Sequence, residues 1–163
     1  MTIKPTIVVK VIYNDLDKLP AQLKRGAREV IDRILRMIVF EVKESMRAPK
    51  SGRSYRRGSI RRKMSASYKG LRTTTTKSGT YAIIGAKIHR ASAPGEAPAV
   101  DYGNLINSVK EKREDMTGYV YTNADYAEVL ETRRHRPFFK PAVDKLTDSF
   151  IKQMDAVVKG LGR

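Results

Sequence analysis

The sequence predicts an α+β domain in which a long N-terminal helix and a C-terminal helix pack on a small antiparallel sheet. Three observations predict it: two segments with apolar residues at helical spacing, short segments of β-branched and aromatic residues between them, and a basic stretch without acidic residues. With 163 residues the chain fits a single domain over residues 1–163, because two domains of half that length would each have a marginal core.

The N-terminal part predicts a strand followed by a long helix. Residues 6–13 are rich in β-branched side chains, which favour a strand. From Pro20 to about Arg47 apolar residues recur every three or four positions, which predicts an amphipathic helix about 40 Å long at about 1.5 Å per residue. Ala48 precedes Pro49, and a residue before proline is pushed out of the α region, so the helix is expected to end there.

A flexible basic loop is predicted at residues 47–79, inserted between the long helix and the sheet. No acidic residue occurs from Ser45 to Gly95, and Arg47 to Arg90 contains thirteen of the 33 lysines and arginines. Without those thirteen, the net charge of +16 falls to +3, from 20 basic and 17 acidic residues. The loop has too few apolar residues to order itself alone, and its charge favours a polyanion or an acidic protein surface as its partner.

The C-terminal half predicts short elements and one more helix. In order, they are a strand at 81–88 with Gly85 placed to form a bulge, a helical turn at 105–109 capped by Asp101, a hairpin at 109–121, a helical segment at 124–131, and a helix from Pro141 to Gly160. The hairpin has its polar turn near Glu114 and Asp115.

The residues needed for catalysis or metal binding are largely missing from the sequence. There is no cysteine, the two histidines belong to no motif, and no phosphate-binding glycine loop occurs. Asp32, Glu41 and Lys43 resemble the acid, acid and lysine set of metal-dependent nucleases, but they lie in a predicted helix, where a solvated polar face is the simpler interpretation. We therefore expect no enzymatic activity, no metal and no cofactor.

The basic loop is the candidate contact surface. Its expected contacts with DNA phosphates or with a neighbouring subunit are Arg53, Arg56, Arg57, Arg61, Arg62 and Lys63, with Tyr55 and Tyr68 interleaved. No helix-turn-helix, zinc finger or RNA-stacking motif accompanies them, so sequence-specific recognition is not expected. A basic loop can also serve solubility alone, and that alternative stays open.

An ordered set of residues extends through the C-terminal half. It begins in a proline-rich approach and continues to the last helix: Pro94, Gly95, Asp101, Gly103, Leu105, Ser108, Tyr126, Ala127, Glu131, Pro137, Phe138, Pro141 and Ala142. In this order the set resembles the tail-component family of tailed bacteriophages, whose members are similar to small head-tail connector or tail-completion proteins. Tyr102 stands where that family has threonine, so Asp101 is expected to supply the cap. The matched residues are expected to be mainly structural.

The resemblance implies a non-enzymatic structural protein of a tailed-phage virion. It would complete the tail or join head to tail in the neck, as a homo-oligomeric ring around the DNA path, with adjoining connector and tail proteins as partners. This places the chain in the virion, and in the host cytoplasm during assembly; a monomer in solution remains compatible with it. No membrane partner is expected, because no apolar run reaches the roughly 20 residues of a spanning helix. The alternative is a sequence-nonspecific nucleic-acid-binding protein that acts through the basic loop.

Overall fold

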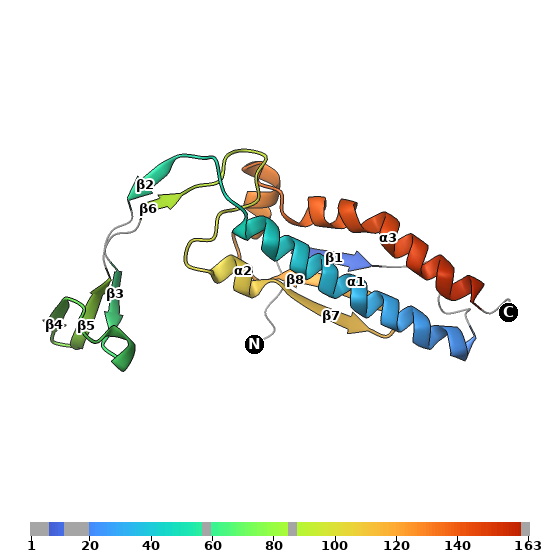
Figure 1. Ribbon diagram of the computed structural model, residues 1–163, viewed down its shortest axis with the longest axis horizontal. Helices are drawn as coiled ribbons and strands as arrows, with labels where there is room; N and C mark the ends of the chain where they lie inside the picture. Colours follow the sequence, from blue (N-terminus) through green and yellow to red (C-terminus); the bar gives the residue numbers. More distant parts are fainter. Residues whose placement is uncertain (1–6, 12–19, 57–59, 85–87, 161–163) are drawn as a thin grey trace. The chain divides into compact units, whose positions relative to one another are not determined.

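The chain is divided into two compact units. The computed structural model describes residues 7–11, 20–56, 60–84 and 88–160, and Figure 1 shows its helices and strands. One unit, which we call the body, comprises Met1–Lys50 and Ser92–Arg163; the other, the basic unit, is Ser51–Ala91. The sequence predicted one domain with a loop at residues 47–79. The structure instead gives the inserted segment internal contacts of its own and extends it to Ala91.

Helix α1 (Ala21–Arg47) confirms the predicted long helix. It begins after Pro20, whose carbonyl oxygen accepts a hydrogen bond from the Leu23 amide at 2.9 Å. It ends where Ala48 turns to an extended conformation, with φ −53° and ψ 148°, as expected for a residue that precedes proline.

The body contains a three-stranded antiparallel sheet that confirms the predicted first strand and hairpin. Its strands are β1 (Ile7–Val11), β7 (Lys110–Glu114) and β8 (Thr117–Thr122), in the order β1-β8-β7. The β7–β8 turn contains Asp115 at φ 50°. Along β8 the buried residues Gly118, Val120 and Thr122 alternate with partly exposed ones, so one face of this strand belongs to the core.

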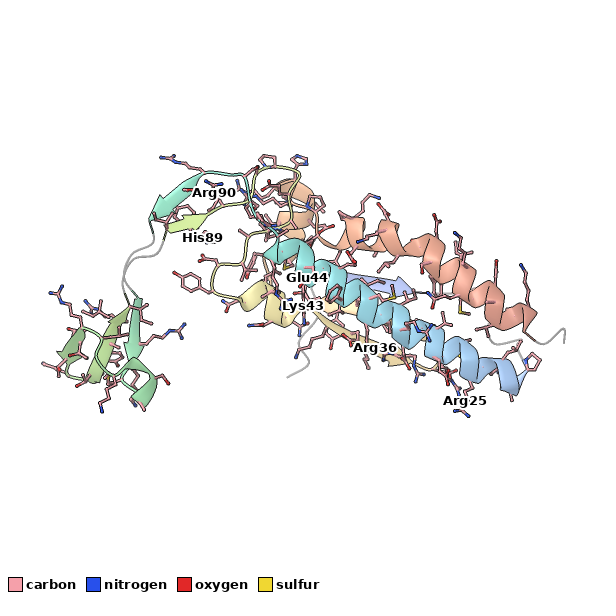
Figure 2. The ribbon with its side chains drawn as sticks, viewed as in Figure 1. Arg25, Arg36, Lys43, Glu44, His89 and Arg90 are labelled. Atoms are coloured by element: carbon pink, nitrogen blue, oxygen red, sulfur yellow. The ribbon has the colours of Figure 1, made fainter. Side chains whose placement is uncertain are left out.

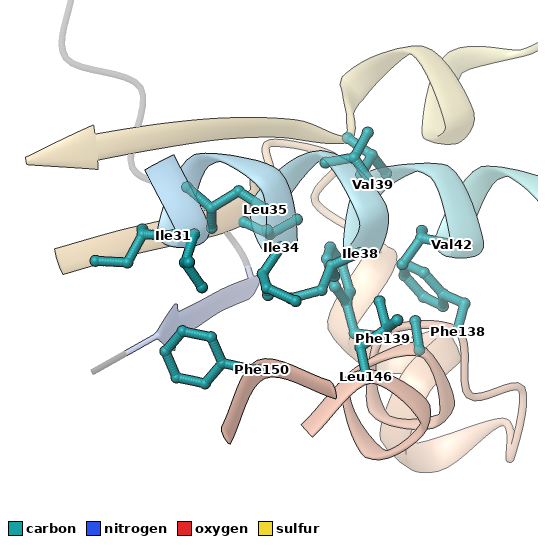
Figure 3. Packing of buried hydrophobic residues seen from close by; sticks show 14 of the residues in the cluster. Ile31, Ile34, Leu35, Ile38, Val39, Val42, Phe138, Phe139, Leu146 and Phe150 are labelled. Carbon is teal, nitrogen blue, oxygen red and sulfur yellow. The ribbon is translucent and has the colours of Figure 1, made fainter. Parts of the chain in front are cut away.

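Helix α3 (Phe139–Lys159) completes the predicted α+β architecture. Helix α1 packs against both α3 and β8, and Figure 3 shows Ile34 and Ile38 of α1 close to Phe139 and Leu146 of α3. Within the described residues, none of the helices combines the length and the apolar character needed to cross a membrane.

The short helix α2 (Asn104–Ser108) corrects the predicted cap. Its N-cap residue is Gly103 at φ 84°, with no side-chain cap hydrogen bond, and the Gly103 carbonyl oxygen accepts from the Asn107 amide at 3.0 Å. The N-cap residue is therefore Gly103 and not Asp101, which lies two residues before it. A left-handed backbone suits glycine, which explains why this position lacks a side-chain cap.

The segment before α3 forms a π-helical turn that holds the cap of α3. In this turn, η3 (Val129–Arg133), the Arg134 amide donates to the Val129 carbonyl oxygen at 2.9 Å, five residues back. The Glu131 carboxylate accepts three backbone hydrogen bonds at the start of α3: from the Phe138 amide at 2.8 Å, from the Phe139 amide at 3.2 Å and from the Lys140 amide at 3.0 Å. These amides have no intrahelical partner, and a negative charge at a helix N-terminus is also favourable, so Glu131 stabilises the entry into α3.

The basic unit consists of strands where the sequence predicted a loop. Strand β2 (Ser54–Arg56) pairs with β6 (Ile88–Arg90), and a second sheet has the order β3 (Ile60–Lys63), β5 (Gly79–Ile84), β4 (Thr73–Thr76). A short 3₁₀ turn, η2 (Ala66–Tyr68), lies between β3 and β4. Backbone hydrogen bonds between the outgoing and returning chain organise this segment despite its low apolar content. The predicted bulge at Gly85 lies outside the described residues.

We predict that Gly118→Ala destabilises the body. A Cβ at this position would lie 2.8 Å from Leu35 Cδ2 and 3.0 Å from Ile31 Cγ2, and both of these α1 side chains are buried. Overpacking of this kind costs about 1–3 kcal/mol. Urea unfolding would measure the loss, with Thr117→Ala, at a partly exposed neighbouring position, as the control; equal stability of Gly118→Ala and the wild type would contradict the close packing.

We also predict that Glu131→Ala destabilises the chain by about 2 kcal/mol, because three backbone amides at the start of α3 lose their acceptor. Glu131→Gln keeps one carbonyl oxygen and should lose less. Thermal or denaturant unfolding of both variants would be compared with that of Glu128→Ala, an exposed glutamate nearby. A loss in Glu131→Ala no larger than that in the control would count against the cap.

Candidate functional site

The charge of the basic unit is of one sign only. Residues 51–91 contain eleven lysines and arginines and no aspartate or glutamate, whereas the remaining residues hold 22 basic and 17 acidic side chains. No carboxylate within the unit can therefore neutralise its cations. Electrostatic repulsion among these cations favours the binding of an external anion. This unit is therefore the candidate binding surface.

Strand β3 separates the basic cluster that the sequence predicted as one group. Arg61 pairs with Ile83 and Lys63 with Tyr81, whereas Arg62 pairs with Ala82. Because successive side chains of a strand point to opposite faces, Arg61 and Lys63 share one face of the sheet and Arg62 lies on the other. All three cationic side chains are exposed.

Hydroxyl groups lie on the same face as Arg61 and Lys63. Thr74 of β4 pairs with Tyr81, which places both on that face. The Tyr81 hydroxyl is hydrogen-bonded to Ser78 Oγ at 3.1 Å, and Ser78 Oγ is hydrogen-bonded to Thr76 Oγ1 at 2.9 Å. We call the face formed by Arg61, Lys63, Thr74, Thr76 and Tyr81 the basic face.

The β2–β6 ribbon holds other predicted contact residues. Tyr55 and His89 stand opposite each other with ring centroids 5.3 Å apart and planes at 72°, and Arg90 Nε donates to Ser54 Oγ at 3.3 Å. Figure 2 shows the side chains of His89 and Arg90 on β6. Of the predicted set, Arg53 is exposed just before β2, Arg56 belongs to β2, and Arg57 lies outside the described residues.

The residues that resemble the phage family all lie in the body, where several hold turns or helix ends. Pro94 and Gly95 form a turn in which the Glu96 amide donates to the Ala93 carbonyl oxygen at 3.2 Å; Gly95 has φ 87°, as in a type II turn. Ala127, Phe138 and Ala142 are buried, Pro137 is half-buried, and Pro141 is exposed in the first turn of α3.

Ser108 forms a partly buried hydroxyl pair with Thr122. Ser108 Oγ donates to the Leu105 carbonyl oxygen at 2.7 Å and is also bonded to Thr122 Oγ1, so Thr122 supplies the proton of the second bond. Thr122 is fully buried, and its Oγ1 also accepts from the Ala124 amide at 3.2 Å. The pair links the end of α2 to β8 and satisfies a polar group that would otherwise be costly to bury.

Two cavities of the body differ in the ionisable side chains that line them. One, of about 340 Å³, is lined by residues that include Leu105, Tyr126 and Met46, and Asp101 is the one carboxylate among its lining residues. The other, also about 340 Å³, is lined by residues that include Lys50, Glu41, Glu96 and Lys145. Lys50 Nζ donates to the Ser45 carbonyl oxygen at 2.6 Å. Burial lowers the pKa of Lys50, and the nearby carboxylate of Glu96 partly opposes this shift.

The acids of the nuclease-like set take part in ion pairs within the body. Asp32 Oδ1 accepts from Arg113 Nε at 2.7 Å, and Glu41 Oε2 accepts from Lys145 Nζ at 2.7 Å. Among the residues that the structure describes, no group of three or more histidine or acidic side chains is arranged to hold a metal ion. These carboxylates tie α1 to β7 and α3.

The sequence did not link Thr74 and Thr76 to the candidate surface, because the threonine run was assigned to a loop, and Tyr81 was placed in the predicted strand at 81–88 without a connection to the basic residues. The β propensity of threonine was the available signal for β4. Comparisons of the chain with protein-family models, with curated proteins and with solved structures found no match.

Proposed function

We propose that this chain is a non-enzymatic structural protein of a tailed-phage virion, which completes the tail or joins head to tail as a ring of copies around the DNA path. The observation that carries the proposal is the ordered set of residues from Pro94 to Ala142 that resembles the tail-component family. The place in the virion, the adjoining connector and tail proteins as partners, and the absence of catalysis all follow from that resemblance.

The roles of these residues in the body support the proposal. Gly103 adopts a left-handed backbone, Ser108 joins α2 to β8, and Glu131 caps α3 through three amides. Positions far apart in the sequence thus meet in the connections between the sheet and the helices. A pattern of this kind specifies a fold, and the members of one protein family share a fold.

The basic unit supplies the second support. A ring forms from heterologous contacts that close by rotation. Every copy therefore has the same orientation: one surface of each copy faces the ring axis, and another contacts the next copy. An unneutralised cationic unit in each copy is suited to face either the DNA in the channel or an acidic surface of an adjoining protein.

The proposal is tested by locating the protein in particles. Antibody labelling of intact virions, viewed by electron microscopy, should mark the head-tail joint or the tail end. Quantitative mass spectrometry should give a copy number that fits one closed ring. Absence of the protein from purified particles would contradict the proposal.

We predict that replacing Ser54–Arg90 by a short glycine-serine linker leaves the body folded but abolishes the assembly of complete particles. The Arg53 carbonyl oxygen accepts from the Ala91 amide at 3.1 Å, so the chain enters and leaves this segment at adjacent points that a short linker can join. Circular dichroism and thermal unfolding would check the body, and complementation of a phage lacking the gene would check assembly. Normal yields of complete particles containing the shortened protein would rule out an essential role for the basic unit.

A further inference from the structure

We infer, relying on the proposed place around the DNA path, that the basic face of β3, β4 and β5 binds the phosphate backbone of DNA without reading its sequence. Arg61 and Lys63 supply the charges, and Thr74, Thr76 and Tyr81 supply hydroxyl groups beside them. Arg62, on the opposite face of the same strand, and Arg53, which precedes β2 outside this sheet, take no direct part, although the sequence predicted both as contacts.

The first step is electrostatic. The unit carries eleven cations and no carboxylate, so binding an anion requires no internal ion pair to be broken. Each phosphate that a lysine or arginine neutralises releases condensed counterions from the DNA, which drives binding at low salt.

The second step is geometric. Arg61 and Lys63 are two residues apart on one strand, a separation of about 7 Å along β3. The side chains of Arg61 and Lys63 are both exposed. Tyr81 of β5 lies directly opposite Lys63 on the neighbouring strand. The chain of hydrogen bonds from Tyr81 through Ser78 to Thr76 fixes the position of these hydroxyl groups. Arginine, lysine, threonine and tyrosine are among the residues that contact phosphate oxygens.

The third step concerns why DNA is favoured over an acidic protein as the partner. Protein interfaces depend on large apolar or aromatic residues that enter packed pockets at the centre of the contact. On this side of the sheet, Tyr81 and Ile83 are the large apolar side chains of β5, and both are already partly buried. Cations and hydroxyl groups make up the exposed part, which suits a phosphate backbone better than a protein.

The absence of a base-reading element follows from the unit's composition. Among the described residues of the basic unit, the one helical element is the three-residue turn η2, too short to lie in the major groove. Paired β-strands can also enter that groove, but residues 51–91 contain no asparagine or glutamine, the side chains that pair with adenine. Binding is therefore expected to be independent of sequence and strongly dependent on salt.

The experiment titrates the full-length protein against a fluorescent DNA duplex of arbitrary sequence, at about 50 and about 200 mM salt. It compares two double variants with the same change of charge. Arg61→Gln/Lys63→Gln removes the cations of the basic face, and Arg53→Gln/Arg62→Gln removes one cation from the opposite face and one from outside this sheet. All four side chains are exposed, so both variants should keep the wild-type melting temperature, which is checked first.

The Arg61/Lys63 variant should lose about tenfold or more in affinity at the lower salt. Its plot of log K against log salt should become less steep by about 1.8, since each phosphate contact contributes about 0.9. The Arg53/Arg62 variant should keep most of the affinity and of the slope.

Equal losses in the two variants would overturn the assignment to this face, because binding would then follow total charge. No binding of the wild type to DNA at low salt, with binding to polyglutamate instead, would overturn it in favour of an acidic protein partner. Labelling of virions decides the proposed function separately. A protein absent from particles that still binds DNA through the basic face would contradict that function and not the binding surface.

Discussion

The body depends on helix α1 burying one continuous apolar face against two partners at once, α3 and the strand β8. At Gly118 of β8, the missing side chain lets Leu35 and Ile31 approach the strand backbone. Removing apolar surface from water stabilises this arrangement by about 25 cal/mol per Å². Helix α1 forms the centre of this core. The connections around it are held by the turns, by the hydroxyl pair of Ser108 and Thr122, and by the Glu131 cap of α3.

The basic unit is held together differently. Among its described residues, Ala82 is the one fully buried hydrophobic side chain, so the pairing of strands supplies much of its order. Eleven positive charges without a carboxylate work against that order. A ligand that binds only the folded form stabilises it by mass action, so an anion that neutralises these charges would also stabilise the sheet that presents them. The proposed binding would therefore be coupled to the order of this unit.

The elements with strong periodicity could be predicted from the sequence, and those that depend on pairing could not. The apolar spacing of α1 and the polar turn of the β7–β8 hairpin are local patterns, and both were confirmed. The division of Arg61, Arg62 and Lys63 between two faces requires knowing that β3 pairs with β5. Composition alone predicted a loop, because it registers the low apolar content and not the backbone hydrogen bonds. The Glu131 cap joins residues seven to nine positions apart through a π-helical turn, beyond the reach of the usual capping motifs.

Acidic side chains of the body pair with cations of the body itself. Asp32, Glu41 and Asp115 each accept from a lysine or arginine of another element, at 2.6–2.7 Å, and so join α1 to α3 and to the β7–β8 hairpin. Exposed pairs of this kind add little to stability, typically below about 1 kcal/mol each. Their larger effect is on the distribution of charge, since they use acids of the body to neutralise its own cations. The basic unit contains no aspartate or glutamate, so no ion pair within the unit neutralises its positive charge.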